Sequence, residues 1–186
     1  MTDHPDILAI DVASTTGWAR GCVGDMEPLF GTVKFAPKGL PGNSNAIFAA
    51  AQGWMSGIMT NPPDIVIVEA LLPPDAMKNK TSRQVRDRLA GLHGIIRAGA
   101  FRAGVGEISE ASVGDVRAHF LGTRILKRLD AKRGVVQRCH DLDWYVTNDN
   151  EGDACALWSF AAGLIDPQQG LRVSPLFNRK LRIKTG

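Results

Sequence analysis

Cysteine is scarce in this sequence, and the few cysteines follow no pairing pattern. Cys22, Cys139 and Cys155 lie far apart in a chain of 186 residues, outside the closely spaced pairs that bind zinc. An odd number of cysteines also argues against a disulfide framework. We therefore expect three reduced thiols with a structural role, which excludes the disulfide-rich and zinc-finger classes.

Long apolar runs are absent as well. No stretch approaches the roughly 18 consecutive apolar residues that a membrane-spanning helix needs. The N-terminal segment MTDHPD is polar and carries acids, unlike a secretory signal. We therefore expect a cytoplasmic protein without a membrane partner.

Internal repeats and a second domain are also lacking. Hydrophobic residues make up 44% of the chain and charged residues 22%, the balance of an ordinary globular protein. We expect one domain over residues 1–166, followed by a basic C-terminal tail over residues 167–186.

Charge is distributed unevenly, although the net charge is only +3. Residues 117–138 contain seven basic residues against one acid, and residues 172–186 contain five basic residues and no acid. Five acids lie between these stretches, in residues 141–153. A basic surface beside an acidic pocket suits a polyanion bound next to metal ions. Solvated faces and a disordered tail explain the same composition equally well.

Hydrophobic patterns and turn residues divide the chain into strands and helices. Strands at residues 7–12, 16–23 and 28–36 are bounded by glycine or proline, which predicts hairpin connections. Residues 64–69 are apolar on both faces, as in a central parallel strand, and residues 104–109 form a short strand. Helices are expected at residues 43–59, 82–103, 112–121, 130–140 and 150–164. The predicted α/β fold is a mixed five-stranded sheet, with three antiparallel hairpin strands and then parallel strands, flanked by helices.

Two carboxylates stand at the ends of predicted central strands. Asp11 ends the first strand and Glu69 ends the strand expected beside it. A single buried acid at such a position is usually hydrogen-bonded to a nearby helix N-terminus. Two of them repel each other unless a cation lies between them, so the pair favours a metal site.

A third set of oxygen ligands opens the last predicted helix. Asp149 and Asp153 are four residues apart and Asn150 and Asp153 three apart, so each pair shares a helix face. Acids in a first turn also suit the helix dipole, which is the structural explanation. Oxygen ligands without histidine or cysteine favour Mg²⁺ or Mn²⁺. Two such ions can drive phosphodiester hydrolysis by activating water and stabilising the leaving oxygen.

The ordered set of motifs is more specific than any one of them. The segments ILAIDVASTTGWA, DIVIVEALLPP, ISEASVGDVRAHFLG, LDAKRGVVQRC and NDNEGDACAL resemble, in this order, the RuvC-type Holliday junction resolvases, and most of all their divergent phage and prophage members. The resemblance implies an RNase H-like fold, and it implies that the protein acts in a bacterial or phage-infected cell. It also implies a homodimer that cuts four-way DNA junctions with two symmetric nicks, using Mg²⁺ or Mn²⁺. By motif, Asp11, Glu69 and Asp153 match the family's acids.

The sequence departs from the family pattern in three places. Val12-Ala13 stands where the family usually has Pro-Gly. The fourth family ligand falls on Asn150, whereas the neighbouring Asp149 carries the charge, and we slightly favour Asp149 as the ligand. The aromatic residue with which the family wedges into the crossover falls near Leu72.

The resemblance also assigns roles to the basic residues. Family residues at positions like those of Arg117 and Lys132 lie beside the scissile phosphate, where Lys132 would neutralise charge during attack. Other basic residues are expected to contact more distant phosphates. The expected DNA-binding residues are Leu72, Arg117, Arg124, Lys127, Arg128, Lys132 and Arg133.

An apolar stripe on the helix expected at residues 82–103 bears on the oligomeric state. Leu89, Leu92, Ile96 and Gly99 follow helical spacing. Most such stripes belong to the core, but the matching family helix also forms the dimer interface. His93 fits a packing or interface residue better than a base.

Three alternatives differ from a junction resolvase. Actin-like ATPases and sugar kinases share this topology, but they need two such domains, which 186 residues do not supply. A catalytically inactive nucleic-acid-binding module is disfavoured by the presence of all three acids. A less selective nuclease for flaps or branched DNA stays open on the residues alone.

Overall fold

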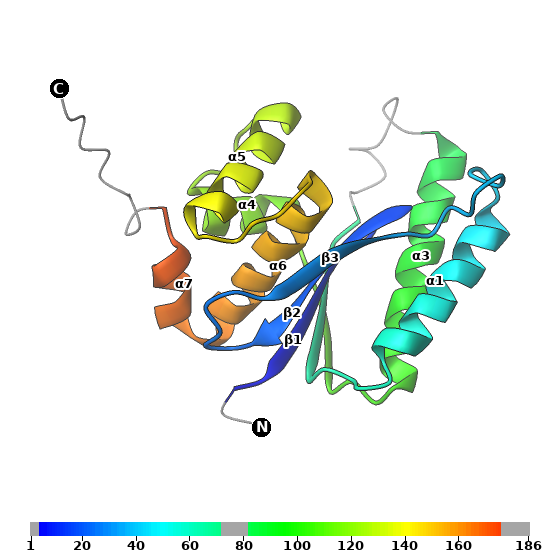
Figure 1. The fold of residues 1–186 in the computed structure, drawn as a ribbon, viewed down its shortest axis with the longest axis horizontal. Helices are drawn as coiled ribbons and strands as arrows, with labels where there is room; N and C mark the ends of the chain where they lie inside the picture. The colour runs from blue at the N-terminus through cyan, green and yellow to red at the C-terminus, as the bar shows by residue number, and fades with distance from the viewer. Residues whose placement is uncertain (1–3, 72–81, 176–186) are drawn as a thin grey trace.

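The sheet of the protein is mixed, and its strand order is β3-β2-β1-β4-β5. A computed structural model describes residues 4–71 and 82–175 (Figure 1). β1 (Asp6–Asp11), β2 (Thr15–Cys22) and β3 (Leu29–Lys34) are antiparallel neighbours. β4 (Ile65–Glu69) pairs in parallel with β1, and β5 (Glu107–Ala111) pairs in parallel with β4. The predicted α/β architecture is confirmed.

Helices cover both faces of this sheet (Figure 1). One face carries α1 (Ser44–Ile58) and α3 (Arg83–Arg102). The opposite face carries α4 (Val113–Leu121), α5 (Arg128–Asp141), α6 (Asp149–Ile165) and α7 (Pro167–Val173). Because the sheet is covered twice, its central strands are apolar on both sides, as predicted for residues 64–69.

The alternation of side chains along β1 shows to which face of the sheet each one points. Ile7 and Ala9 belong to the core beneath α6, whereas Leu8 and Ile10 belong to the core beneath α1 and α3. All four side chains are fully buried. Successive strand residues point to opposite faces. Asp11 therefore follows Ala9 onto the face that carries α6.

Most of the apolar stripe on α3 is part of the core. Leu92 and Ile96 are fully buried, and Gly99 lies against Met55 of α1, where an added Cβ would be 3.2 Å from the methyl group of Met55. The structure therefore places Leu92, Ile96 and Gly99 in the contact between α3, α1 and the sheet, whereas Leu89 is half-buried and lines a pocket together with Asp11 and Glu69. The stripe was expected to pack in the core or to form a dimer interface, and within this chain most of it packs in the core.

Two differences from the expected element boundaries change the course of the chain. The fifth strand begins at Glu107 rather than at residue 104, because α3 ends at Arg102 and Gly104 turns the chain with φ +81° before pairing with β4 begins. The first seven residues of the expected tail form α7, whose Gln169 and Val173 are buried. The amide N–H of Gly24 donates to Oε1 of Gln169 at 2.7 Å, which ties α7 to the turn after β2.

The remaining expectations concern cysteines and membranes. Cys22, Cys139 and Cys155 are free thiols, and the latter two are buried in the core beneath α6. No helix in residues 4–71 and 82–175 has the length and apolar character to span a membrane.

Candidate active site

Asp11 and Glu69 are brought together by parallel strand pairing. Ile10 of β1 lies opposite Val68 of β4, and the two acids are the next residues on their strands. Ala9 and Ile67 precede them by two positions and face α6, so both carboxylates point to the same face. The ends of β1 and β4 therefore present two adjacent acids on a rigid backbone.

The first turns of α6 complete this group. Asp153 is half-buried and interacts electrostatically with both Asp11 and Glu69. The approach of α6 depends on Gly17, which pairs with Asp11 across the β1–β2 ladder. A Cβ on Gly17 would lie 1.9 Å from the carbonyl oxygen of Asn150. Only glycine lets the helix start come this close to the strand.

Glu151 anchors the same helix start and is not part of the site. Its side chain accepts hydrogen bonds from the Thr147 amide at 2.7 Å and from the Thr32 hydroxyl at 2.9 Å. The side chain of Asn148 caps α6 by accepting from the Glu151 amide at 3.1 Å. The Asn148–Glu151 spacing is that of a capping box, a sequence signal that separates Glu151 from the acids of the site. These bonds fix the first turn of α6 against β3.

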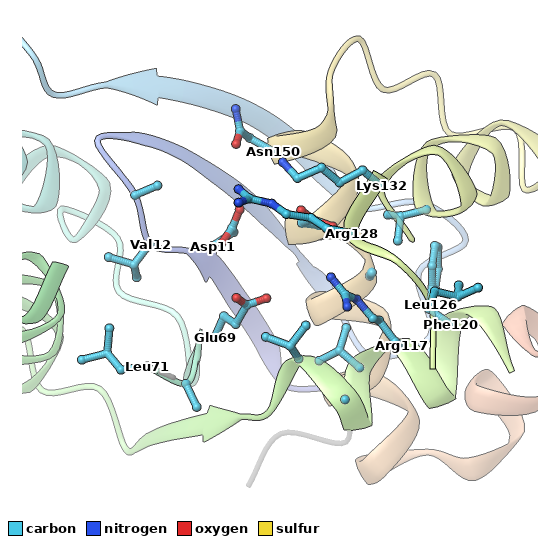
Figure 2. Close-up of a pocket in the computed structure, with 18 of the residues that line it drawn as sticks. Asp11, Val12, Glu69, Leu71, Arg117, Phe120, Leu126, Arg128, Lys132 and Asn150 are labelled. Carbon is cyan, nitrogen blue, oxygen red and sulfur yellow. The ribbon is translucent and has the colours of Figure 1, made fainter. Parts of the chain in front are cut away.

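The acids open into a pocket of about 730 Å³ with a basic wall (Figure 2). Arg117 extends from α4 toward the side that holds Glu69, whereas Arg128 and Lys132 reach in from α5. Apolar side chains complete opposite sides, with Leu71 on one and Leu126 on the other. The pocket thus joins half-buried carboxylates to basic side chains, of which Arg128 is exposed and Arg117 and Lys132 are half-buried.

The two candidates for the fourth ligand lie differently. Asn150 lines the pocket, next to Lys132 in Figure 2. Asp149 is held in an ion pair with Lys132, and this hydrogen bond lowers the pKa of its carboxyl. Asp149 therefore links α6 to α5 through this ion pair.

The remaining expected DNA-binding residues fall into three groups. Arg117, Arg124, Arg128 and Lys132 line the pocket. Lys127 and Arg133 are exposed near it, on the linker before α5 and on α5 itself. Leu72 lies outside the described residues, although its neighbour Leu71 is on the pocket wall.

Burial and mutual repulsion hold protons on the acids. Burial, followed by repulsion from Glu69 and Asp153, raises the pKa of Asp11 well above its usual value. Burial raises the pKa of Glu69 from 4.5 to about 7, with a further contribution from Asp153. Burial likewise raises the pKa of Asp153 from 3.8 to about 6, against the opposing effect of Lys132. A cation bound nearby would stabilise the ionised form of these carboxylates.

Two observations bear on whether this cluster suits a metal ion. Within residues 4–71 and 82–175, no three His, Cys, Asp or Glu side chains converge closely enough to hold one ion in this conformation. The electrostatics favour a cation, and the donors are the oxygens that Mg²⁺ prefers. Carboxylate rotamers adjust on binding while strand pairing fixes the backbone, so the side chains can converge on an ion that the electrostatics favour. The donor set therefore fits a hard divalent cation.

Comparison with known proteins shows which fold carries this site. No family model and no curated protein matches the sequence. Among solved structures, RuvC of Thermus thermophilus in complex with a Holliday junction substrate superposes with a TM-score of 0.65 at 15% identity, covering 92% of this chain and 98% of that one. The chain has the RuvC fold.

Two further structures agree. Another T. thermophilus RuvC structure gives a TM-score of 0.60 at 14% identity, over 89% of this chain and 96% of that chain. The yeast mitochondrial Holliday junction resolvase Ydc2 gives 0.50 at 13% identity, over 92% and 82%. The RNase H-like architecture implied by the motif resemblance is thereby confirmed, and identities this low speak for the fold alone.

Because the pKa of Glu69 is raised in the folded protein, its ionisation at neutral and higher pH is predicted to lower the stability of this RuvC-fold protein. The folded carboxyl keeps its proton up to about pH 7, whereas the unfolded one releases it above pH 4.5. Between these values the folded state binds more protons, so stability falls as pH rises. Glu69→Gln removes this penalty. We expect it to raise the melting temperature by roughly 7–14 °C at pH 8 and by almost nothing at pH 4.

Calorimetry of both proteins from pH 4 to pH 8 measures this difference. Glu107→Gln is the matched control, because it removes an exposed carboxylate from the start of the neighbouring β5. A Glu69→Gln protein that melts below the wild type at pH 8 would contradict the prediction, because it would mean that Arg117 stabilises the charged carboxylate.

Proposed function

We propose that this protein is a divalent-metal-dependent endonuclease that cuts branched DNA, with the four-way junction as its preferred substrate. The observation that carries the proposal is the group of three half-buried acids, Asp11, Glu69 and Asp153, in one pocket with lysine and arginine side chains. The fold supports it, because solved structures with this fold include Holliday junction resolvases. As a DNA enzyme of this type, the protein would act in the cytoplasm.

The acids and the basic wall have separate tasks in this proposal. Asp11, Glu69 and Asp153, together with Asn150 or Asp149, would hold Mg²⁺ or Mn²⁺, with two ions expected per site. When bound, these ions activate the attacking water and stabilise the leaving oxygen of the phosphodiester. Arg117 and Lys132 lie next to the acids and would stabilise the charge that builds on the scissile phosphate.

Two coordinated nicks in a junction need two active sites. The described residues of one chain hold a single pocket with this group of acids, so the proposal includes a homodimer. Since Leu92 and Ile96 are buried within the chain, the interface would use other residues of α3 or other surfaces.

The direct test incubates the protein and Mg²⁺ with a labelled four-way junction, with duplex, flap and single-stranded DNA of the same sequence as controls. Paired nicks in the junction alone, by a protein that light scattering shows to be a dimer, are expected. Equal cutting of flaps and junctions would support the less selective nuclease. Binding without cutting, with Mg²⁺ or Mn²⁺, would support an inactive binding module.

Lys132 and Arg128 are expected to act on different steps. Lys132→Ala should lower single-turnover cleavage by roughly 100-fold with little change in junction affinity, because its ammonium group lies beside the acids. Arg128→Ala should weaken binding and reduce the salt dependence of the binding constant by about one counterion. Each variant is the control for the other. Equal, modest effects of both on binding alone would contradict this division.

Asp149 and Asn150 can be separated by their effect on metal dependence. Asn150 lies in the pocket wall, whereas Asp149 is paired with Lys132. These positions support Asn150 as the fourth ligand, against the slight preference for Asp149 that its charge suggested. We expect Asn150→Ala to raise the Mg²⁺ concentration for half-maximal cleavage by about tenfold, as losses around metal sites do. Asp149→Asn should leave that concentration unchanged, and the reverse result would restore Asp149.

A further inference from the structure

The linker between α4 and α5, residues 123–127, together with the first turn of α5, carries apolar side chains into solvent. Ile125 is 90% exposed, the highest value among the large apolar side chains of the described residues, and Leu129 is 69% exposed. Single exposed apolar residues are common on protein surfaces. Two of them within five positions, at the edge of a candidate active site, are less easily explained in this way.

These apolar residues are surrounded by positive charge. Arg124, Lys127 and Arg128 are exposed in the same segment, and Arg124, Leu126 and Arg128 line the pocket that holds the acids. The segment is therefore continuous with the active-site wall. An apolar tip flanked by cations fits a partner that combines a polyanionic chain with flat apolar groups, which is the chemistry of nucleic acid with accessible bases.

The linker is anchored rather than loosely attached. Gly122 ends α4 in the left-handed region, with φ 73°, and its N–H donates to the carbonyl of Ala118. The guanidinium of Arg124 lies 2.6 Å from the carboxylate of Asp115 on α4, and the amide N–H of Ile125 donates to the Thr123 hydroxyl at 3.2 Å. Ile125 is thus presented in a fixed position relative to α4.

We infer that Ile125 and Leu129, which we call the branch wedge, contact unstacked bases where the arms of the bound DNA meet. This inference rests on the proposed function. At a branch point, base stacking is interrupted, so an apolar side chain can cover a base face at a smaller cost than in continuous duplex. Arg124, Lys127 and Arg128 would hold the flanking phosphates. Leu71 lies on the opposite side of the pocket from Leu126, the neighbour of Ile125, so the acids are bordered by apolar side chains on two sides (Figure 2).

The competing occupant is a second copy of this chain. The three cations in the segment make that less favourable, since an identical copy would bring the same cations against them if the segment met itself. Polyanionic DNA removes that repulsion. The charge pattern therefore selects DNA over self-association at this surface.

The test compares wild type with Ile125→Ser and with the double variant Ile125→Ser/Leu129→Ser. Affinity for a four-way junction and for duplex of the same sequence is measured at one salt concentration. A 2-aminopurine base at the branch point reports unstacking by a rise in fluorescence. For the double variant we expect about a tenfold loss of junction affinity, the effect of one large apolar contact. Duplex affinity and its salt dependence should stay unchanged, and the 2-aminopurine signal should disappear.

Leu29→Ser is the matched control. Leu29 is 75% exposed but lies at the start of β3, opposite Arg20, at the other end of the sheet from Asp11. It should leave both affinities and the fluorescence signal unchanged.

The outcomes separate this inference from the function on which it rests. If the wild type prefers and cuts the junction while the double variant keeps both the preference and the signal, the branch wedge is overturned and the proposed function stands. If light scattering shows that the double variant has lost its dimer, the surface is an interface between copies, which also overturns the wedge. A wild type without preference for the junction would overturn the proposed function and the wedge together.

Discussion

Asp11→Asn, Glu69→Gln and Asp153→Asn are each expected to lower junction cleavage by at least roughly 100-fold while leaving junction binding intact or tighter. The three acids come from β1, β4 and α6 and are half-buried in one group, so each supplies charge that the other two cannot replace. Removing one preorganised group from an active site costs about 10²–10³ in rate. Affinity should not fall, since each change removes a carboxyl group that repels the phosphate chain when it is ionised.

Single-turnover cleavage and binding to the same labelled junction separate the two effects. Asp6→Asn is the matched control, because it makes the same change on β1 at the opposite end of the strand, where Asp6 pairs with Arg20. That variant should cut like the wild type. An Asp11, Glu69 or Asp153 variant with near wild-type turnover at saturating Mg²⁺ would remove that residue from the site.

The predicted effects of Glu69→Gln on cleavage and on stability have the same cause. The burial that raises the pKa of Glu69 to about 7 makes the site unfavourable for folding at pH 8, and the same charge makes it suitable for a cation. Glu69→Gln is therefore expected to melt higher and to cut less. A variant that lost both activity and stability would instead indicate that Glu69 has a structural role.

The acids of the site could be found from the sequence because local patterns determine their positions. Asp11 and Glu69 each end an apolar run, and parallel pairing places neighbouring strand ends side by side. Asp153 follows from helical spacing and from the apolar residues behind it, which pack α6 on the sheet. Each of these inferences needs only the period of a helix or strand.

Other features depend on contacts between distant segments, which periodicity does not encode. The stripe on α3 is apolar whether it meets α1 or a second chain, so its spacing showed only that it is buried. Glu151 resembled its acidic neighbours, but its bonds to Thr32 and Thr147 make it an anchor for α6. The exposure of Ile125 also depends on how the linker after α4 lies, and an apolar residue in a sequence does not reveal this.

Gly17 is the clearest case of a contact that the sequence concealed, and Gly17→Ala should damage both stability and cleavage. The strand predicted at residues 16–23 includes Gly17, but only the structure shows that it lies opposite Asp11 and against the start of α6. An added Cβ would lie 1.9 Å from the carbonyl oxygen of Asn150 and 2.5 Å from its carbonyl carbon. Both atoms are backbone, so no change of rotamer relieves the overlap.

The start of α6 must therefore move away from β2, and Asp153 moves with it. Overpacking of this kind costs about 1–3 kcal/mol, or roughly 2–12 °C in melting temperature for a domain of this size. A misplacement of about 1 Å in an active site can lower the rate about 100-fold, so we expect a loss of that order in single-turnover cleavage. Calorimetry and cleavage of the labelled junction measure the two effects.

Gly31→Ala is the control for glycine replacement in a strand. It lies on β3, where the three atoms nearest to an added Cβ all belong to the ring of Trp18, the closest at 3.1 Å, and a side chain can shift. We expect small effects on melting and cleavage there. Gly17→Ala is expected to lose both stability and activity, whereas Glu69→Gln is expected to gain stability as it loses activity. A Gly17→Ala protein that cuts like the wild type would mean that the position of Asp153 does not depend on the contact between α6 and β2.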